Sequence, residues 1–254
     1  EYLAAKIKVY EHCDVAVVNL DDPRLANTVP ANTTRLSFST TQQAADFCIR
    51  EQAGRSNLCY ADQAILPVAE LPLFGRYNWE NALVASAMAV AMDIAISDIA
   101  QALREFRGLD HRCQWVIEHQ GVNWYNDSKG TNVGATVAAI ESFTERQQKI
   151  VLIAGGLAKG GEFSALRAAL QAGNSRGAVL FGADAKRIEK DLKGALPVQT
   201  VTDLTQAVKQ AKQWAQSGDV VLFSPACASF DMFNNYRHRG DSFVQAVKQV
   251  LHVS

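Results

Sequence analysis

Three stretches of this sequence combine charged, hydroxyl-bearing and small residues where a strand pattern gives way to a helical one. They are NDSKGTN at 126–132, GGLAKGGEF at 155–163 and SPACASFDMFNNY at 224–236. Open α/β sheets bind ligands at the carboxyl ends of their strands. Lys129 near a helix N-terminus would attract phosphate or carboxylate, and the glycines around Lys159 let the backbone approach a ligand closely. Taken alone, NDSKGTN and GGLAKGGEF are also compatible with ordinary surface loops.

Several other catalytic patterns are absent. The sequence has no G-x-x-x-x-G-K-[ST] phosphate loop, no G-x-G-x-x-G and no H-E-x-x-H. Cys227, inside the third stretch, is interpreted as a buried inert thiol, because no histidine stands in the sequence context of a catalytic cysteine. We therefore expect no metal site made wholly of this chain's residues.

The elements that must position these stretches follow from the apolar patterning. From residue 110 onward, the apolar runs KIVLIAG, RGAVLFG, PVQTV and DVVLFSP alternate with segments of helical period, after a hairpin that turns at Gln120-Gly121. Alternating strands and helices with apolar strands predict a mostly parallel sheet covered on both faces. Residues 110–254 are therefore expected to form a Rossmann-like domain of α/β class.

Residues 1–109 show a different pattern. We expect strands at 14–20 and 34–38, an antiparallel meander over 45–69, and a helix over 82–92 that is buried because it is apolar all round. A second helix should follow, with Ser97 as its N-cap and Gly108 as its stop.

The composition sets outer limits. The chain has 254 residues, 48% of them hydrophobic, with 25 basic and 26 acidic side chains. This length suits one large or two modest domains, and the apolar content excludes a disordered chain. The near-neutral net charge gives no sign of the basic surface that would bind nucleic acid or an anionic membrane. Five scattered cysteines without a C-x-x-C pair fit reduced thiols in a cytosol.

The three stretches together, in this order and spacing, resemble the Mur ligases, and among them the type that adds D-glutamate. The resemblance runs along essentially the whole chain and is most specific in the pairing of NDSK-x-TN with SPACAS. Its anchors are YLAAKIKVYEH, GRYNWENALVA, GLDHRCQWV, WYNDSKGTNVGAT, the glycine loop with Lys159, and SPACASFDMF.

This resemblance implies an activity. Mur ligases use ATP and Mg²⁺ to convert a carboxylate into an acyl phosphate, which an amino acid's amine attacks to form an amide bond in peptidoglycan precursor synthesis. For this type the substrates are UDP-N-acetylmuramoyl-L-alanine and D-glutamate, and the intact enzyme is a cytoplasmic monomer. No nucleic acid or membrane partner is implied.

The resemblance also assigns residues. Lys6, Arg112 and Lys129 match catalytic positions, and Lys6 matches a lysine that CO₂ carbamylates, which would give Mg²⁺ the oxygen ligands an ammonium cannot offer. The positions facing ATP are Asn78, Asn81, Arg112 and Asp127, with the asparagines at the adenine and Arg112 near the terminal phosphate. The positions around D-glutamate are Lys129, Thr131, Lys159, Ser229 and Tyr236, where tyrosine replaces the expected phenylalanine.

The family's UDP-binding domain and phosphate loop are not in this sequence. The resemblance therefore implies the second half of the central ATP-binding domain at 1–109 and the complete amino-acid-binding domain at 110–254. We expect a fragment, made by design or by proteolysis, that cannot ligate alone and holds no cofactor tightly. The half-domain should expose apolar surface, so we also expect partial disorder or self-association near residues 1–100. The alternatives are another Mur ligase, a folylpolyglutamate-synthetase-like ligase, or a non-catalytic Rossmann-like module that binds an acidic metabolite.

Overall fold

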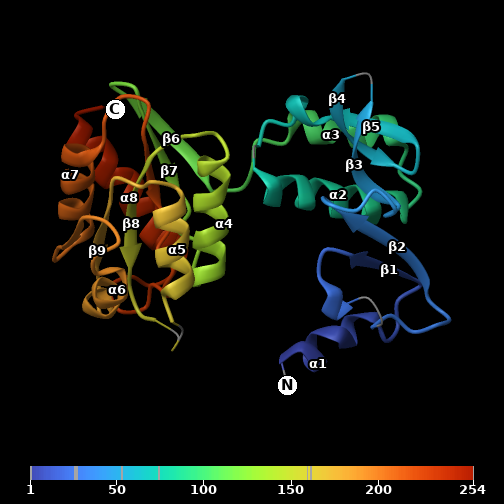
Figure 1. Cartoon of the computed structure of the whole chain (residues 1–254), viewed down its shortest axis with the longest axis horizontal. Coiled ribbons are helices and arrows are strands. Elements are labelled where there is room, and N and C mark those ends of the chain that lie inside the picture. Colours follow the sequence, from blue (N-terminus) through green and yellow to red (C-terminus); the bar gives the residue numbers. More distant parts are fainter. Residues whose placement is uncertain are drawn as a thin grey trace. The chain divides into compact units, whose positions relative to one another are not determined.

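The computed structural model describes residues 2–25, 28–52, 54–73, 75–158, 160 and 162–253. The chain divides into two compact units, which we call the N-terminal unit (Glu1–Arg107) and the C-terminal unit (Gly108–Ser254). Each unit has its own sheet with helices packed on it (Figure 1), which confirms the α/β class. None of the described helices combines the length and the apolar character that crossing a membrane requires.

The N-terminal unit is built on a five-stranded mixed sheet in the order β1-β2-β3-β4-β5. Neighbouring strands run parallel from β1 to β3 and antiparallel from β3 to β5, as the expected meander requires. The strands are β1 (Val15–Asn19), β2 (Thr34–Ser39), β3 (Phe47–Gln52), β4 (Arg55–Tyr60) and β5 (Gln63–Pro67). The short helices are α1 (Tyr2–Ile7), η1 (Lys8–Tyr10), η2 (Pro23–Leu25) and η3 (Val68–Glu70).

Two longer helices cover this sheet, and both differ from the sequence-based expectation. Helix α2 (Arg76–Val90) packs across β1 to β4 through Leu83 and Ala87, yet its Met88 is 58% exposed, so the helix is buried on one face only. Helix α3 (Ile96–Glu105) begins one residue before the predicted cap Ser97, and its N-cap is Ala95; Ile96 in its first turn packs on the core.

Apolar side chains remain exposed on the N-terminal unit. Those at least 42% exposed on its described part are Val9, Met88, Met92, Ile94 and Phe106. Exposed apolar side chains favour association with another surface where they form a contiguous patch. Self-association of the chain stays a prediction, which sedimentation velocity at several protein concentrations would check.

The C-terminal unit has a six-stranded sheet in the order β10-β9-β8-β11-β7-β6. All neighbouring strands are parallel except β6 and β7, which form the predicted hairpin with left-handed Gln120 and Gly121 at its turn. The strands are β6 (Gln114–His119), β7 (Val122–Asn126), β8 (Ile150–Gly155), β9 (Gly177–Phe181), β10 (Val198–Thr200) and β11 (Val220–Phe223).

Helices cover both faces of this sheet (Figure 1). Helices α4 and α5 pack against each other, and α7 and α8 form a second packed pair. The α7–α8 pair packs on the sheet, and its apolar side chains share one hydrophobic core with Trp124, Ile153 and Phe223 of the strands. The helices are α4 (Val133–Thr144), α5 (Ser164–Ala172), α6 (Ala185–Leu192), α7 (Leu204–Trp214) and α8 (Tyr236–Leu251).

The end of β8 depends on a glycine. Gly155 has φ +131°, and a Cβ there would lie 1.8 Å from the Phe181 carbonyl oxygen of β9. We expect Gly155→Ala to lower the free energy of unfolding by about 2–3 kcal/mol in urea titrations. The matched control is Gly194→Ala. Gly194 has φ +77°, but a Cβ there would have no atom within 4 Å, so alanine should add only backbone strain and cost about 1 kcal/mol. Equal losses in the two variants would contradict the steric explanation.

Candidate functional site

The three polar stretches lie at one edge of the C-terminal sheet. They leave the carboxyl ends of β7, β8 and β11, which are neighbouring parallel strands. We call them the β7 loop (127–132), the β8 loop (156–163) and the β11 loop (224–235). This is the crevice position where open α/β sheets bind ligands.

Hydrogen bonds join the β11 loop to both of the others. The Ser224 hydroxyl donates to Asp127 Oδ2 at 2.7 Å, and the Ala226 N–H donates to the Gly130 carbonyl at 2.9 Å, both on the β7 loop. On the other side, Ala228 and Leu157 exchange two backbone bonds of 2.9 and 3.0 Å. The structure therefore brings the three loops into direct contact.

Two helices begin at these loops with their N-termini capped by asparagine. Asn132 Oδ1 accepts from the Ala135 N–H at 2.9 Å at the start of α4, and Asn235 Oδ1 accepts from the His238 N–H at the same distance at the start of α8. A helix N-terminus carries partial positive charge. Both helix ends thus favour an anionic group near the loops.

Lys129 and Tyr236 meet between the β7 loop and α8. The half-buried Lys129 places Nζ 4.1 Å from the centre of the Tyr236 ring, a cation–π contact. The Arg237 Nε–H donates to the Tyr236 hydroxyl, and this bond, aided by the charges of Arg237, Lys129 and Arg112, lowers the pKa of the phenol. The replacement of phenylalanine by tyrosine therefore keeps an aromatic ring against Lys129.

The remaining predicted D-glutamate residues have different environments. Thr131 is half-buried just before α4, and Ser229 is 3% exposed in the β11 loop, where its carbonyl accepts the Phe233 N–H at 2.9 Å. Lys159 lies outside the described residues. Its place relative to Ser229 therefore remains a prediction.

Asp127 is a buried carboxylate at the centre of the site. Its Oδ1 accepts the Cys113 N–H at 3.1 Å and its Oδ2 accepts the Ser224 hydroxyl. Burial raises the pKa of Asp127 to about 6, although these two bonds and the charges of Arg112 and Arg239 act in the opposite direction. The protein thus places a buried carboxyl group with a raised pKa beside the loops, a combination that is common at functional sites.

The raised pKa of Asp127 has a measurable consequence. Its ordinary value is 3.8, so between pH 4 and 6 the folded chain holds a proton that the unfolded chain has lost. The stability this group contributes is therefore fully present below pH 4 and falls by about 3 kcal/mol as pH rises through 6. Asp127→Asn lacks this titration, so the variant should gain about 3 kcal/mol relative to wild type between pH 4 and 7. Parallel pH profiles in urea unfolding would contradict this.

Arg112 is close enough to Asp127 for its charge to lower the pKa of this carboxyl group, although the two residues are well separated in sequence. It is exposed, and it belongs to the segment 108–113 whose Cys113 N–H binds Asp127. The N–H of Lys129 donates to the carbonyl of His111 at 3.0 Å, so the same segment also holds the β7 loop. The structure therefore groups Arg112, Asp127 and Lys129.

Arg239 is a site residue that sequence reasoning missed. Its guanidinium is fully buried on α8 and donates to the Ser128 hydroxyl (3.1 Å), the Ser128 carbonyl (2.8 Å) and the Cys227 carbonyl (3.0 Å). It thus ties the β7 loop to the β11 loop. The sequence could have indicated that Arg239 is buried. Arg239, Phe243 and Val247 follow one another at four-residue spacing, which places Arg239 on the apolar face of the helix.

Cys227 is confirmed as a buried thiol. The side chain is fully buried, and burial raises its pKa to about 12. A thiol at that pKa supplies almost no thiolate, which is the nucleophilic form.

The predicted site residues of the N-terminal unit lie on two helices. Lys6 is exposed on α1. Asn78 is half-buried and Asn81 exposed in the first turns of α2, and their three-residue spacing places them on the same helix face. Their part in binding adenine stays a prediction.

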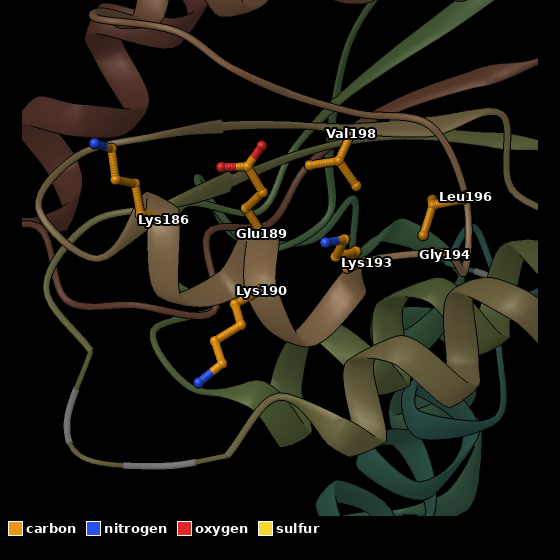
Figure 2. Close-up of a pocket in the computed structure, with 7 residues that line it drawn as sticks. All are labelled: Lys186, Glu189, Lys190, Lys193, Gly194, Leu196 and Val198. Carbon is orange, nitrogen blue, oxygen red and sulfur yellow. The ribbon is translucent and has the colours of Figure 1, made fainter.

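No group of three or more His, Cys, Asp or Glu side chains among the described residues could hold a metal ion. A shallow groove beside α6 and β10 is lined by lysines, but Figure 2 shows the amines of Lys186 and Lys190 pointing away from each other. The groove lacks the converging cations that an anion site needs.

Comparison with known proteins gives two family matches. The family described as Mur ligase middle domain matches residues 1–89, and the family described as Mur ligase, glutamate ligase domain, matches residues 111–227. The chain is 43% identical over 249 residues to the UDP-N-acetylmuramoylalanine–D-glutamate ligase of Coxiella burnetii, and 45% identical over 251 residues to that of Nitrosococcus oceani. Both alignments cover 98% of this chain, but only 56% and 55% of the relatives.

Solved structures show the same fold at lower identity. The UDP-N-acetylmuramate–alanine ligase MurC of Thermotoga maritima matches with a TM-score of 0.70 and 18% identity, over 98% of this chain and 55% of that one. A bifunctional folylpolyglutamate synthase/dihydrofolate synthase of Yersinia pestis, solved with AMPPNP and a Mn ion, matches with a TM-score of 0.65 and 19% identity, with the same coverage.

The chain thus spans about half the length of the curated relatives it matches, and both of its units find their counterparts in one family. With the three linked loops at the sheet edge, these matches identify the chain as a member of the Mur ligase family.

Proposed function

We propose that this chain is part of a ligase that uses ATP to join D-glutamate to UDP-N-acetylmuramoyl-L-alanine. The identity of 43–45% to ligases of that name, along 98% of the chain, carries the proposal. The site chemistry supports it, because the β7, β8 and β11 loops meet beside two helix N-termini that favour anions. Cytoplasmic location follows from such a role, since ATP and the nucleotide-linked precursor are cytoplasmic substrates.

The C-terminal unit would bind the incoming amino acid. D-Glutamate carries two carboxylates, and we assign them to the cations and hydroxyls of Lys129, Thr131, Lys159 and Ser229 and to the start of α8 at Tyr236. Arg112 would stabilise negative charge on the transferring phosphoryl group. Asp127 would hold the backbone that carries Arg112 through its bond to the Cys113 N–H.

The N-terminal unit, as the second half of the ATP-binding domain, would contact the nucleotide. We assign the adenine to Asn78 and Asn81, whose side chains share one face of α2. Lys6, converted to a carbamate by CO₂, would offer oxygen ligands to Mg²⁺, the cation that neutralises phosphate charge in such reactions.

The test uses the product of the complete reading frame that contains this chain. We expect phosphate release from ATP only when both UDP-N-acetylmuramoyl-L-alanine and D-glutamate are present, and none with L-glutamate. Turnover of a folate with L-glutamate would favour the folylpolyglutamate-synthetase alternative. D-Glutamate binding without turnover would favour the non-catalytic module. The isolated 254-residue chain should release no phosphate.

A further inference from the structure

The side chain of Asn126 connects three segments that are far apart in sequence. It is fully buried at the end of β7. Its Oδ1 accepts the Ser128 N–H at 3.1 Å, and its Nδ2 lies 3.2 Å from the Gly240 carbonyl and 3.0 Å from His111 Nδ1. The β7 loop, α8 and segment 108–113 therefore meet at one amide.

The orientation of this amide is fixed by its backbone partners. The Ser128 N–H can only donate, so the atom facing it must be the oxygen of Asn126. The Gly240 carbonyl can only accept, so the atom facing it must be the nitrogen. A flipped amide would lose both bonds and place like groups against each other.

This orientation determines the tautomer of His111. Asn126 Nδ2 carries two hydrogens, and its two shortest contacts are His111 Nδ1 at 3.0 Å and the Gly240 carbonyl at 3.2 Å, while Gln114 Oε1 lies farther away at 3.5 Å. An N–H on His111 Nδ1 would face these hydrogens at 3.0 Å, so Nδ1 accepts and the ring proton sits on Nε2. His111 Nε2 faces Asp241 Oδ1 at 3.8 Å. The ring fits because residue 240 is glycine, where a Cβ would lie 2.2 Å from Nδ1.

His111 in turn holds backbone that carries proposed catalytic groups. Its carbonyl accepts the Lys129 N–H at 3.0 Å, and its own N–H donates to Gln114 Oε1 at 3.1 Å. His111 has φ +65°, a left-handed backbone conformation that few residues other than glycine adopt. This conformation sets the direction in which the chain continues to Arg112. A shift of the buried ring would therefore move both Arg112 and Lys129.

We propose that Asn126 is a positioning residue which locks His111 in the Nε2-protonated tautomer and thereby fixes Arg112 and Lys129 relative to each other. The assignment of a tautomer rests on geometry alone. The catalytic consequence rests on the proposed ligase function.

The first test is nitrogen NMR of the imidazole in the wild-type chain, which needs no activity. We expect His111 to show an unprotonated Nδ1 and a protonated Nε2. In the isosteric Asn126→Asp variant, a carboxylate oxygen faces Nδ1, and the ring proton should move to Nδ1. A wild-type His111 protonated on Nδ1 would overturn the proposal, whether or not the variant folds.

The second test compares His111→Asn with His111→Gln in the product of the complete reading frame. Asparagine can place an oxygen near the position of Nδ1 and keep the acceptor for Asn126, whereas glutamine extends to the position of Nε2. We expect the asparagine variant to retain kcat within about threefold and the glutamine variant to lose roughly 100-fold in kcat, with KM for ATP nearly unchanged. His119→Gln, on the β6–β7 hairpin, is the matched control and should behave as wild type.

The outcomes separate the two proposals. Equal losses in the asparagine and glutamine variants would show that the acceptor at Nδ1 is not what matters and would overturn the positioning role. A wild-type protein without ligase activity would overturn the proposed function, while the NMR result would still decide the tautomer.

Discussion

Replacing Arg239 by methionine is expected to lower the free energy of unfolding by about 3–5 kcal/mol. The guanidinium is fully buried, and its three hydrogen bonds to Ser128 and Cys227 satisfy two carbonyls and a hydroxyl. Methionine fills similar space but donates nothing, so buried acceptors lose their partners, each at a cost of about 1–3 kcal/mol. Urea unfolding at neutral pH measures the loss.

The matched control for this prediction lies two positions earlier on the same helix. Arg237 is exposed and its guanidinium donates to the Tyr236 hydroxyl, so Arg237→Met should change stability by less than about 0.5 kcal/mol. Burial lowers the pKa of Arg239 to about 10, which still leaves it charged at neutral pH. A methionine variant at position 239 as stable as the one at position 237 would show that the buried bonds do not hold the loops together.

Replacing Lys129 by methionine in the product of the complete reading frame should raise KM for D-glutamate roughly 100-fold. The half-buried ammonium lies beside the starts of α4 and α8, where the proposed substrate carboxylates would be poorly hydrated. Truncating one partner of such a charge pair costs about 2–5 kcal/mol. Steady-state kinetics with D-glutamate as the varied substrate, at saturating ATP, provide the measurement.

Two further variants show whether charge or placement matters at this position. Lys129→Arg keeps the positive charge and should lose less affinity than the methionine variant. Tyr236→Phe keeps the ring whose centre lies 4.1 Å from Lys129 Nζ, whereas Tyr236→Leu removes it. We expect the phenylalanine variant to match wild type and the leucine variant to raise KM for D-glutamate severalfold. An unchanged KM in Lys129→Met would contradict the assignment of this lysine to the substrate.

The strands and loops of the C-terminal unit could be predicted because the apolar runs and turn residues that indicate them lie within short segments of the sequence. Apolar runs such as KIVLIAG and DVVLFSP became β8 and β11, and the hairpin turned at Gln120 and Gly121 as expected. Since parallel strands end at a common edge, the order of strands and helices also predicted where polar loops would gather. Helix α2 was less predictable, because its composition alone did not reveal that Met88 faces solvent.

The α/β class, the three loops and the family could be predicted from the sequence, because apolar period and motif spacing are properties of short segments. The folded structure was needed to show that Arg239 ties Ser128 to Cys227, that Asn126 orients His111, and that burial brings the pKa of Asp127 to about 6. These properties depend on contacts between distant segments, such as that of Ser128 with Arg239, which are 111 positions apart in the sequence, and on how much water folding removes from the buried groups. Local sequence patterns reveal neither the long-range contacts nor the degree of burial.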